Sequence, residues 1–207
     1  MQIFSFRTIQ NPSEGQYKEK WSKFLGFAFP VQSEHEVKER IGELKKKYFD
    51  ARHHCYAYIL GFDKSRFRAN DDGEPNHSAG DPILGQIRSK GLTNVLVVVV
   101  RYFGGVKLGV GGLISAYKIA AQSVLDSAVI VEKEVSQRYE IRYTYMNTPE
   151  VMRLVKDFNL EIHNQSFEEE CKIEVTLIVR SKEQFEEKVK LLKSMGSSIS
   201  IMEIPLS

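Results

Sequence analysis

The sequence predicts an α+β protein of two domains, residues 1–131 and 132–207. Three observations predict it. The aliphatic run from Val95 to Val100 is typical of a strand buried on both faces, because it lacks the polar alternation of a half-exposed strand. Segments with apolar residues at helical spacing precede and follow that run. After the charged stretch Val131–Val135, the chain follows the order strand, helix, strand, strand, helix, strand.

In the first domain we expect strands at Met1–Ile9 and Phe24–Val31, paired with each other, and a turn at Asn11–Gly15. Before the second strand the chain is basic around its sole tryptophan, Trp21. Such a residue either covers the edge of a core or stacks on a nucleic-acid base. Covering a core is the commoner role, and we predict it here.

The other elements of the first domain follow from capping and spacing. Ser33 and Glu36 have the pattern of a capping box, and the apolar residues after them predict an amphipathic helix packed on the sheet. We further expect a strand at Cys55–Phe62, its hairpin partner at Lys64–Asn70, a short helix at Ala79–Ser89 and a long helix at Leu113–Val131.

The second domain is predicted to contain strand Ser136–Tyr145, helix Thr148–Phe158, strand Leu160–Glu168, strand Lys172–Val179, helix Lys182–Ser194 and strand Ser198–Ile204. Tyr139, Tyr143 and Tyr145 fall on one face of its first strand. They either pack in a core or between domains, or form an RNA-stacking platform. The sequence lacks the glycine-aromatic signature of RNA-recognition modules, which favours packing.

Composition narrows the classes of protein. At 207 residues, 42% hydrophobic and 27% charged, the chain is ordinary for a soluble protein, and no apolar window is long enough to span a membrane. We expect neither secretion nor membrane insertion, and a cytoplasmic location. Cys55 and Cys171 fall in different predicted domains, so we expect no disulfide. The net charge is +5 over residues 1–131 and −3 over residues 132–207, so only the first domain attracts phosphate backbones, and mildly.

A glycine-rich loop separates the buried strand from the long helix. It holds Gly104, Gly105, Gly109, Gly111 and Gly112, with Arg101 and Lys107 beside them. Glycines let backbone amides approach a ligand, and amides at a helix start carry partial positive charge. The loop is therefore a candidate site for an anion or nucleic acid, to which we add the upstream Arg68. The alternative is that the glycines only satisfy turn geometry and tight packing. The spacing matches neither a dinucleotide nor a nucleoside-triphosphate motif.

An acidic turn lies upstream of that loop: Asp71, Asp72 and Glu74, held by Gly73 and Pro75 and followed by His77 and Ser78. Three carboxylates within four positions need a divalent cation, the basic residues near the glycine loop, or exposure to solvent. If a metal binds, its ligands are Asp71, Asp72 and Glu74; no other cofactor is expected. Cys55, with His53 on the same face of its strand, is a weak candidate nucleophile, and a buried structural thiol is the commoner case.

Three motifs together resemble the YigZ/IMPACT family of small translation-associated proteins. They are DARHHCYAY (50–58), DDGEP with SAGDPIL (71–84) and VVVVRYFGGVKLGVGGLISAY (97–117). The resemblance implies a first domain like the second domain of small-subunit ribosomal protein five, with helices on one face of a sheet. It also implies a ferredoxin-like βαββαβ second domain similar to one in elongation factor G. The chain departs from the family pattern at Asn76, His77 and Ser78, and at Asp81, where the family is commonly basic.

The preferred functional hypothesis is a non-enzymatic, translation-associated regulator. Its glycine loop and DDGEP face would bind RNA, the ribosome or a protein partner linked to it, and no membrane. The alternative is a metal-assisted enzyme acting on a small phosphorylated or peptide-like substrate, with the three carboxylates as metal ligands or as acid and base. A third interpretation makes both motifs structural, with buried carboxylates holding the loop.

Overall fold

The computed structural model describes residues 3–168 and 170–205. Contacts within the chain divide it into two compact units. Ser5–Lys133 forms one unit, and the chain from Glu134 onward, with the described residues before Ser5, forms the other. None of the described helices is long and apolar enough to cross a membrane.

The first unit is built on a five-stranded antiparallel sheet with the strand order β2-β3-β6-β4-β5. The strands are β2 (Ser13–Glu19), β3 (Ser22–Pro30), β4 (His53–Leu60), β5 (Arg66–Asn70) and β6 (Val95–Tyr102). β6 is the central strand, and its residues from Val95 to Val100 are completely buried. The structure thus confirms the central, buried strand expected from this run.

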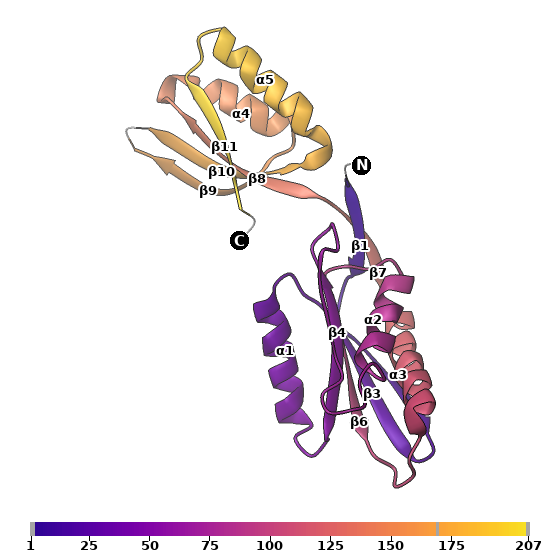
Figure 1. The fold of residues 1–207 in the computed structure, drawn as a ribbon. Coiled ribbons are helices and arrows are strands. Elements are labelled where there is room, and N and C mark those ends of the chain that lie inside the picture. The colour runs from indigo at the N-terminus through magenta and orange to yellow at the C-terminus, as the bar shows by residue number, and fades with distance from the viewer. Residues whose placement is uncertain (1–2, 169, 206–207) are drawn as a thin grey trace. The chain divides into compact units, whose positions relative to one another are not determined.

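Helices cover both faces of this sheet, as Figure 1 shows. α1 (Glu34–Lys47) packs on one face, and α2 (Gly80–Ser89) and α3 (Gly109–Asp126) pack on the other. Alternate residues of β6 belong to the two cores. The expectation of helices on one face is therefore wrong. A strand that is apolar at every position buries side chains in both directions, so each face needs its own cover.

The pairing expected at the N-terminus is also wrong. β1 (Ser5–Ile9) pairs with β7 (Ile130–Glu134) in a separate two-stranded sheet, and β3 pairs instead with β2, which begins where a turn was expected. β2 is an edge strand with the sequence SEGQYKE, so it lacks the apolar alternation that identifies a strand. The last residues of the expected long helix, from Ile130 on, form β7.

The second unit has the predicted element order. It contains β8 (Ser136–Tyr143), α4 (Thr148–Asp157), β9 (Glu161–Phe167), β10 (Cys171–Ile178), α5 (Lys182–Ser194) and β11 (Ile199–Ile204), with short 3₁₀ turns at Tyr145–Asn147 and Val179–Ser181. The strand order is β11-β8-β10-β9, with every neighbouring pair antiparallel. This is the split βαβ arrangement.

The tyrosines of β8 do not form an RNA-stacking platform. Tyr139 and Tyr143 are 1% exposed and lie in the core with residues of both helices. Tyr145 lies beyond the strand, in a 3₁₀ turn, and is 78% exposed. The packing interpretation is therefore confirmed for the first two residues, and the third does not share their face.

Candidate functional site

Asp71 of the acidic turn caps a helix. Its carboxylate accepts hydrogen bonds from the backbone N–H groups of Ala79 (2.9 Å), Gly80 (2.8 Å) and His77 (2.9 Å). The Ala79 and Gly80 amides belong to the start of α2, whose N-cap residue makes no side-chain capping hydrogen bond, and the His77 amide belongs to the turn before it. Partial burial opposes ionisation, but the three donors outweigh it and hold the pKa of Asp71 below its ordinary value.

Replacing Asp71 with alanine is expected to lower the free energy of unfolding by about 1–2 kcal/mol at neutral pH, because the start of α2 loses its cap. The folded-state pKa is depressed, so the stabilisation is complete above the unfolded pKa of an aspartate and disappears as the pH falls through the folded value. Urea unfolding of both proteins over an acid pH series tests this. A difference in stability that persists unchanged at the lowest pH would contradict it.

Asp72 points in another direction. Its Oδ2 accepts a hydrogen bond from the backbone N–H of His54 on β4 (2.7 Å), and its Oδ1 lies 3.3 Å from Lys45 Nζ on α1. Its carbonyl accepts from His53 Nδ1 at 2.9 Å. Asp72 therefore links the turn to the face of the sheet that α1 covers, at a backbone φ of 41°.

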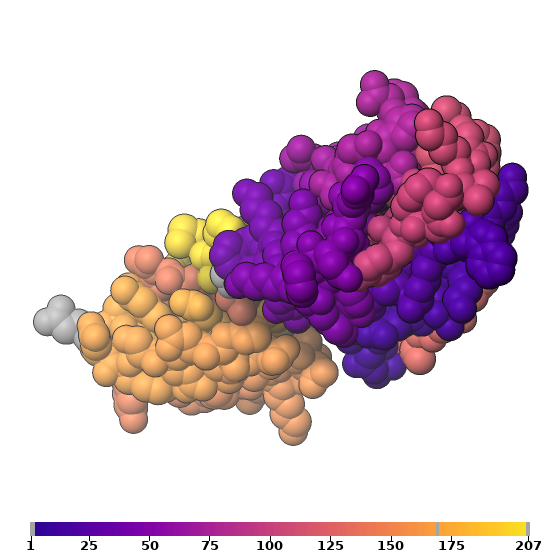
Figure 2. Space-filling view, turned by 90° about the horizontal axis from the view of Figure 1, so that it is seen from below, coloured from indigo at the N-terminus to yellow at the C-terminus, as the bar shows by residue number. Residues whose placement is uncertain are grey.

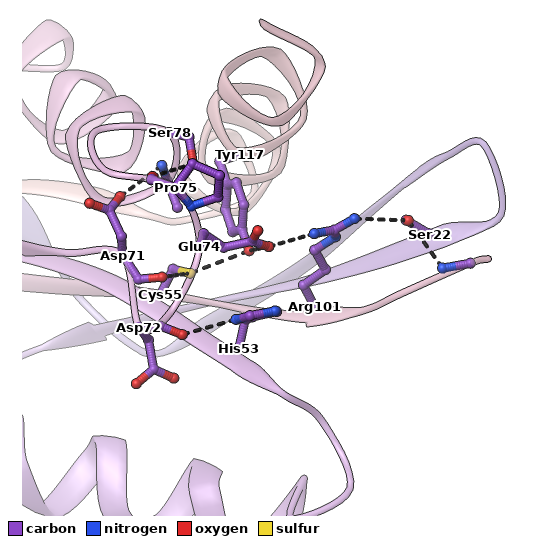
Figure 3. Close-up of polar contacts among 12 residues, drawn as sticks. Ser22, His53, Cys55, Asp71, Asp72, Glu74, Pro75, Ser78, Arg101 and Tyr117 are labelled. Carbon is purple, nitrogen blue, oxygen red and sulfur yellow. Dashed lines mark hydrogen bonds and ion pairs between the residues drawn. The ribbon is translucent and has the colours of Figure 1, made fainter. Parts of the chain in front are cut away.

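Glu74 points into the protein. Its Oε1 accepts hydrogen bonds from Arg101 Nη1 (2.6 Å) and from the Tyr117 hydroxyl (2.8 Å), and the Glu74 and Arg101 side chains are 4% and 7% exposed (Figure 3). Tyr117 also accepts a hydrogen bond from the Cys55 thiol at 3.3 Å. The acidic turn, β4, β6 and α3 are thus joined by one buried polar cluster.

The three carboxylates diverge, each with its own protein donors. No group of three or more histidine, cysteine, aspartate or glutamate residues in the described part of the chain is arranged to hold a metal ion. Cys55 is also unsuited to nucleophilic attack, because burial raises the pKa of its thiol far above the ordinary value. This geometry corresponds to the structural interpretation of the acidic turn.

The remaining polar residues of the turn act locally. Ser78 is buried and donates its hydroxyl proton to the Pro75 carbonyl (2.6 Å). His77 is exposed, and its Nδ1 lies 2.6 Å from Asp81 Oδ2. Asp81 is thus a partner for this histidine.

The predicted bases do not share one surface. Arg68 is exposed on β5 and pairs across the strands with Tyr58, which belongs to the core under α1. Arg101 extends to the opposite face, where its guanidinium lies between the rings of Phe24 (5.5 Å) and Phe103 (5.7 Å) and pairs with Glu74. Its charge is already compensated. Lys107, in the glycine loop, is exposed.

The glycine loop has two parts with different roles. Gly104 is a packing residue: a Cβ there would lie 2.0 Å from the backbone carbon of Trp21. Gly105 and Gly111 have open space around them, as does Gly109, the first residue of α3. Leu108, the N-cap residue of α3, makes no side-chain capping hydrogen bond among the described residues, and the first turn of α3 carries no acidic residue. Gly112 instead lies close to the Leu108 side chain. The N-terminal amides of α3 are therefore accessible beside Lys107.

Comparison with known proteins places these features in a family. Residues 20–125 match the Impact N-terminal domain, a stretch that includes the acidic turn and the glycine loop. The chain belongs to the IMPACT family. The resemblance inferred from its three motifs is confirmed.

Several relatives carry the family name. The chain is 37% identical over 133 residues to IMPACT family member YvyE of Bacillus subtilis (strain 168), a match that covers 64% of this chain and 61% of the relative. It is 28% identical over 172 residues to IMPACT family member YigZ of Escherichia coli (strain K12), covering 82% and 84%. A crystal structure described as that of a hypothetical protein matches with a TM-score of 0.77 and 26% identity over 100% of both chains.

In this IMPACT family member, Trp21 does not cover the edge of a core. It occupies the tip of the β2–β3 hairpin and is 87% exposed, so the expected core-covering role is wrong. Phe103, 54% exposed beside it, was not singled out at all. The signal available in the sequence was the set of lysines that flank Trp21, because charged side chains are mostly exposed.

Proposed function

We propose that this IMPACT family protein is a non-enzymatic, cytoplasmic, translation-associated regulator that binds RNA or a ribosome-linked partner. Its contact surface is the end of the first unit that holds the glycine loop. The observation that carries the proposal is the uncapped start of α3, where open glycines expose backbone amides beside Lys107. Such amides and a lysine favour phosphate oxygens.

The DDGEP turn supports this surface from within. Its carboxylates are engaged with α2, β4 and Arg101, so the turn holds the strands and helices that present the loop. This division of roles also argues against acid–base catalysis by the turn, because Glu74 is buried in an ion pair and Asp71 accepts three backbone hydrogen bonds.

The Lys107→Glu variant is expected to reduce co-sedimentation with ribosomes or their subunits, and binding of the unmodified protein is expected to weaken with added salt, because phosphate contacts release counterions. A plot of the logarithm of the binding constant against the logarithm of the salt concentration has a negative slope. Loss of one phosphate contact reduces the magnitude of that slope by about one. The matched control is Lys38→Glu, which makes the same charge change on the exposed side of α1, the helix on the opposite sheet face.

Absence of co-sedimentation at low salt, or equal effects of the two variants, would refute this contact surface. Arg101 is unsuitable for the test. A glutamate there would bury a second negative charge beside Glu74, so loss of folding would be mistaken for loss of binding.

A further inference from the structure

Trp21 is exposed at the tip of a hairpin, in a backbone conformation that costs free energy. Glu19 pairs with Ser22, so Lys20 and Trp21 form a two-residue hairpin turn. Both have positive φ values, 44° and 67°, a conformation that favours asparagine and glycine and disfavours a bulky side chain. The indole is 87% exposed and gains little from burial. Neither turn preference nor core packing accounts for a tryptophan here.

Contacts with Gly104 and Arg101 hold the Lys20–Trp21 turn in place. The backbone of Gly104 packs directly against that of Trp21, and its N–H donates to Ser22 Oγ at 3.2 Å. Arg101 Nη2 donates to the same oxygen at 3.4 Å and is itself held by Glu74 (Figure 3). Glu74, Arg101 and Gly104 are therefore positioning residues for the tryptophan, and a chain of contacts runs from the acidic turn through Arg101 and Ser22 to the hairpin tip.

The surface around Trp21 is aromatic and basic. The hairpin tip, the loop after β6 and the start of α3 lie at one end of the first unit (Figure 1), and in Figure 2, viewed from that end, the indigo hairpin adjoins the pink loop and helix. The exposed apolar residues there are Trp21, Phe103, Val106 and Val110, and the exposed lysines are Lys18, Lys20, Lys23 and Lys107. Over residues 18–23 and 103–112 the one carboxylate is Glu19, which accepts a hydrogen bond from Tyr17.

We propose that this surface, the tryptophan end, binds single-stranded RNA, with Trp21 and Phe103 stacking on unpaired bases and the lysines contacting phosphates. The inference rests on the proposed function and specifies its ligand. Four lysines against one carboxylate complement a polyanion. Exposed rings fixed beside such charges bind base faces, which are accessible only where bases are unpaired.

The sole tryptophan of the chain reports directly on this site. Titration with a short unstructured CA-repeat RNA is expected to quench its fluorescence as a base stacks on the indole. With fluorescein-labelled RNA and anisotropy as readout, Trp21→Ala is expected to weaken binding about tenfold or more, and Phe103→Ala by a similar factor. Trp21→Phe retains a ring and most of the affinity. The control is Phe62→Ala. Phe62 is 42% exposed and follows the last residue of β4, Leu60, whereas the first residue of β4, His53, pairs with Arg101. This variant is expected to bind RNA as the unmodified protein does.

Salt dependence separates stacking from charge. Trp21→Ala is expected to lower the affinity for RNA at every salt concentration without changing the slope of the salt dependence. Lys107→Glu is expected to make that slope less steep. If Lys107→Glu weakens RNA binding while Trp21→Ala binds as the unmodified protein does, stacking is rejected and the proposed function stands. If neither variant changes RNA binding, the stacking proposal and the proposed contact surface are both rejected.

Two further outcomes overturn the ligand class. Quenching by anionic phosphatidylglycerol vesicles without quenching by RNA would identify a membrane contact. Ribosome binding that depends on Trp21 while the free RNA does not bind would identify a protein partner. Equal thermal unfolding of Trp21→Ala and the unmodified protein confirms that each comparison is made on folded protein, as expected for a side chain outside the core.

Discussion

Replacing Glu74 with glutamine is expected to lower the free energy of unfolding by about 3–5 kcal/mol, the range measured when one partner of a buried ion pair is removed. The substitution keeps the shape of the side chain but leaves the guanidinium of Arg101 without a compensating charge in a site where both side chains are almost fully buried. Arg101 Nε already has no hydrogen-bond partner among the described residues, so nothing nearby takes over. Urea unfolding followed by circular dichroism measures the loss.

The double variant Glu74→Met/Arg101→Met is the control, because it removes both charges and fills similar volume. It is expected to recover most of the stability, since an apolar pair often replaces a buried ion pair at little cost. A Glu74→Gln protein as stable as the unmodified one would show that the pair contributes nothing to the fold. The double variant also tests the further inference: a stable protein without Arg101 loses one support of the Trp21 turn and is expected to bind RNA more weakly.

The fold was predictable where local pattern and burial agree. The second unit has amphipathic helices with clear starts at Thr148 and Lys182 and a strand, β10, that alternates strictly, so its element order could be predicted. β6 was predictable for the opposite reason, since a run that is apolar at every position, here Val95 to Val100, is typical of a strand covered on both faces. β2 was missed because an edge strand with polar residues resembles a turn, and the β1 pairing was missed because no local signal specifies a partner more than 100 residues away.

The candidate site was predictable as a set of motifs but not as a geometry. Sequence spacing indicated that three carboxylates and a glycine loop matter together; it did not indicate that Asp71, Asp72 and Glu74 point to three different elements. An arginine beside glycines resembles a ligand contact, and only the tertiary structure reveals the internal carboxylate that it pairs with. Trp21 is exposed because it lies at the tip of a hairpin. The first strand of that hairpin, β2, has no apolar alternation, so the sequence pattern did not predict it.

Replacing Gly104 with alanine is expected to lower the free energy of unfolding by about 3 kcal/mol, at the upper end of the cost of overpacking. The added Cβ would lie 2.0 Å from the Trp21 backbone carbon, 2.3 Å from the Ser22 nitrogen and 2.4 Å from the Trp21 oxygen. These are backbone atoms of a paired hairpin, so no side chain can rotate away. The hairpin tip has to move, which breaks the Gly104 to Ser22 hydrogen bond and misplaces Trp21.

Gly111→Ala is the matched control, since a Cβ there meets nothing within 4 Å and the residue lies in the first turn of α3. It is expected to be neutral or to stabilise the protein by up to about 1 kcal/mol, because alanine favours the helix. If the open glycines admit a phosphate to the α3 amides, Gly111→Ala weakens RNA binding without a loss of stability, whereas Gly104→Ala loses both. Equal stability of the two variants would contradict the packing role of Gly104, and full RNA binding by Gly111→Ala would show that the ligand does not approach the helix backbone there.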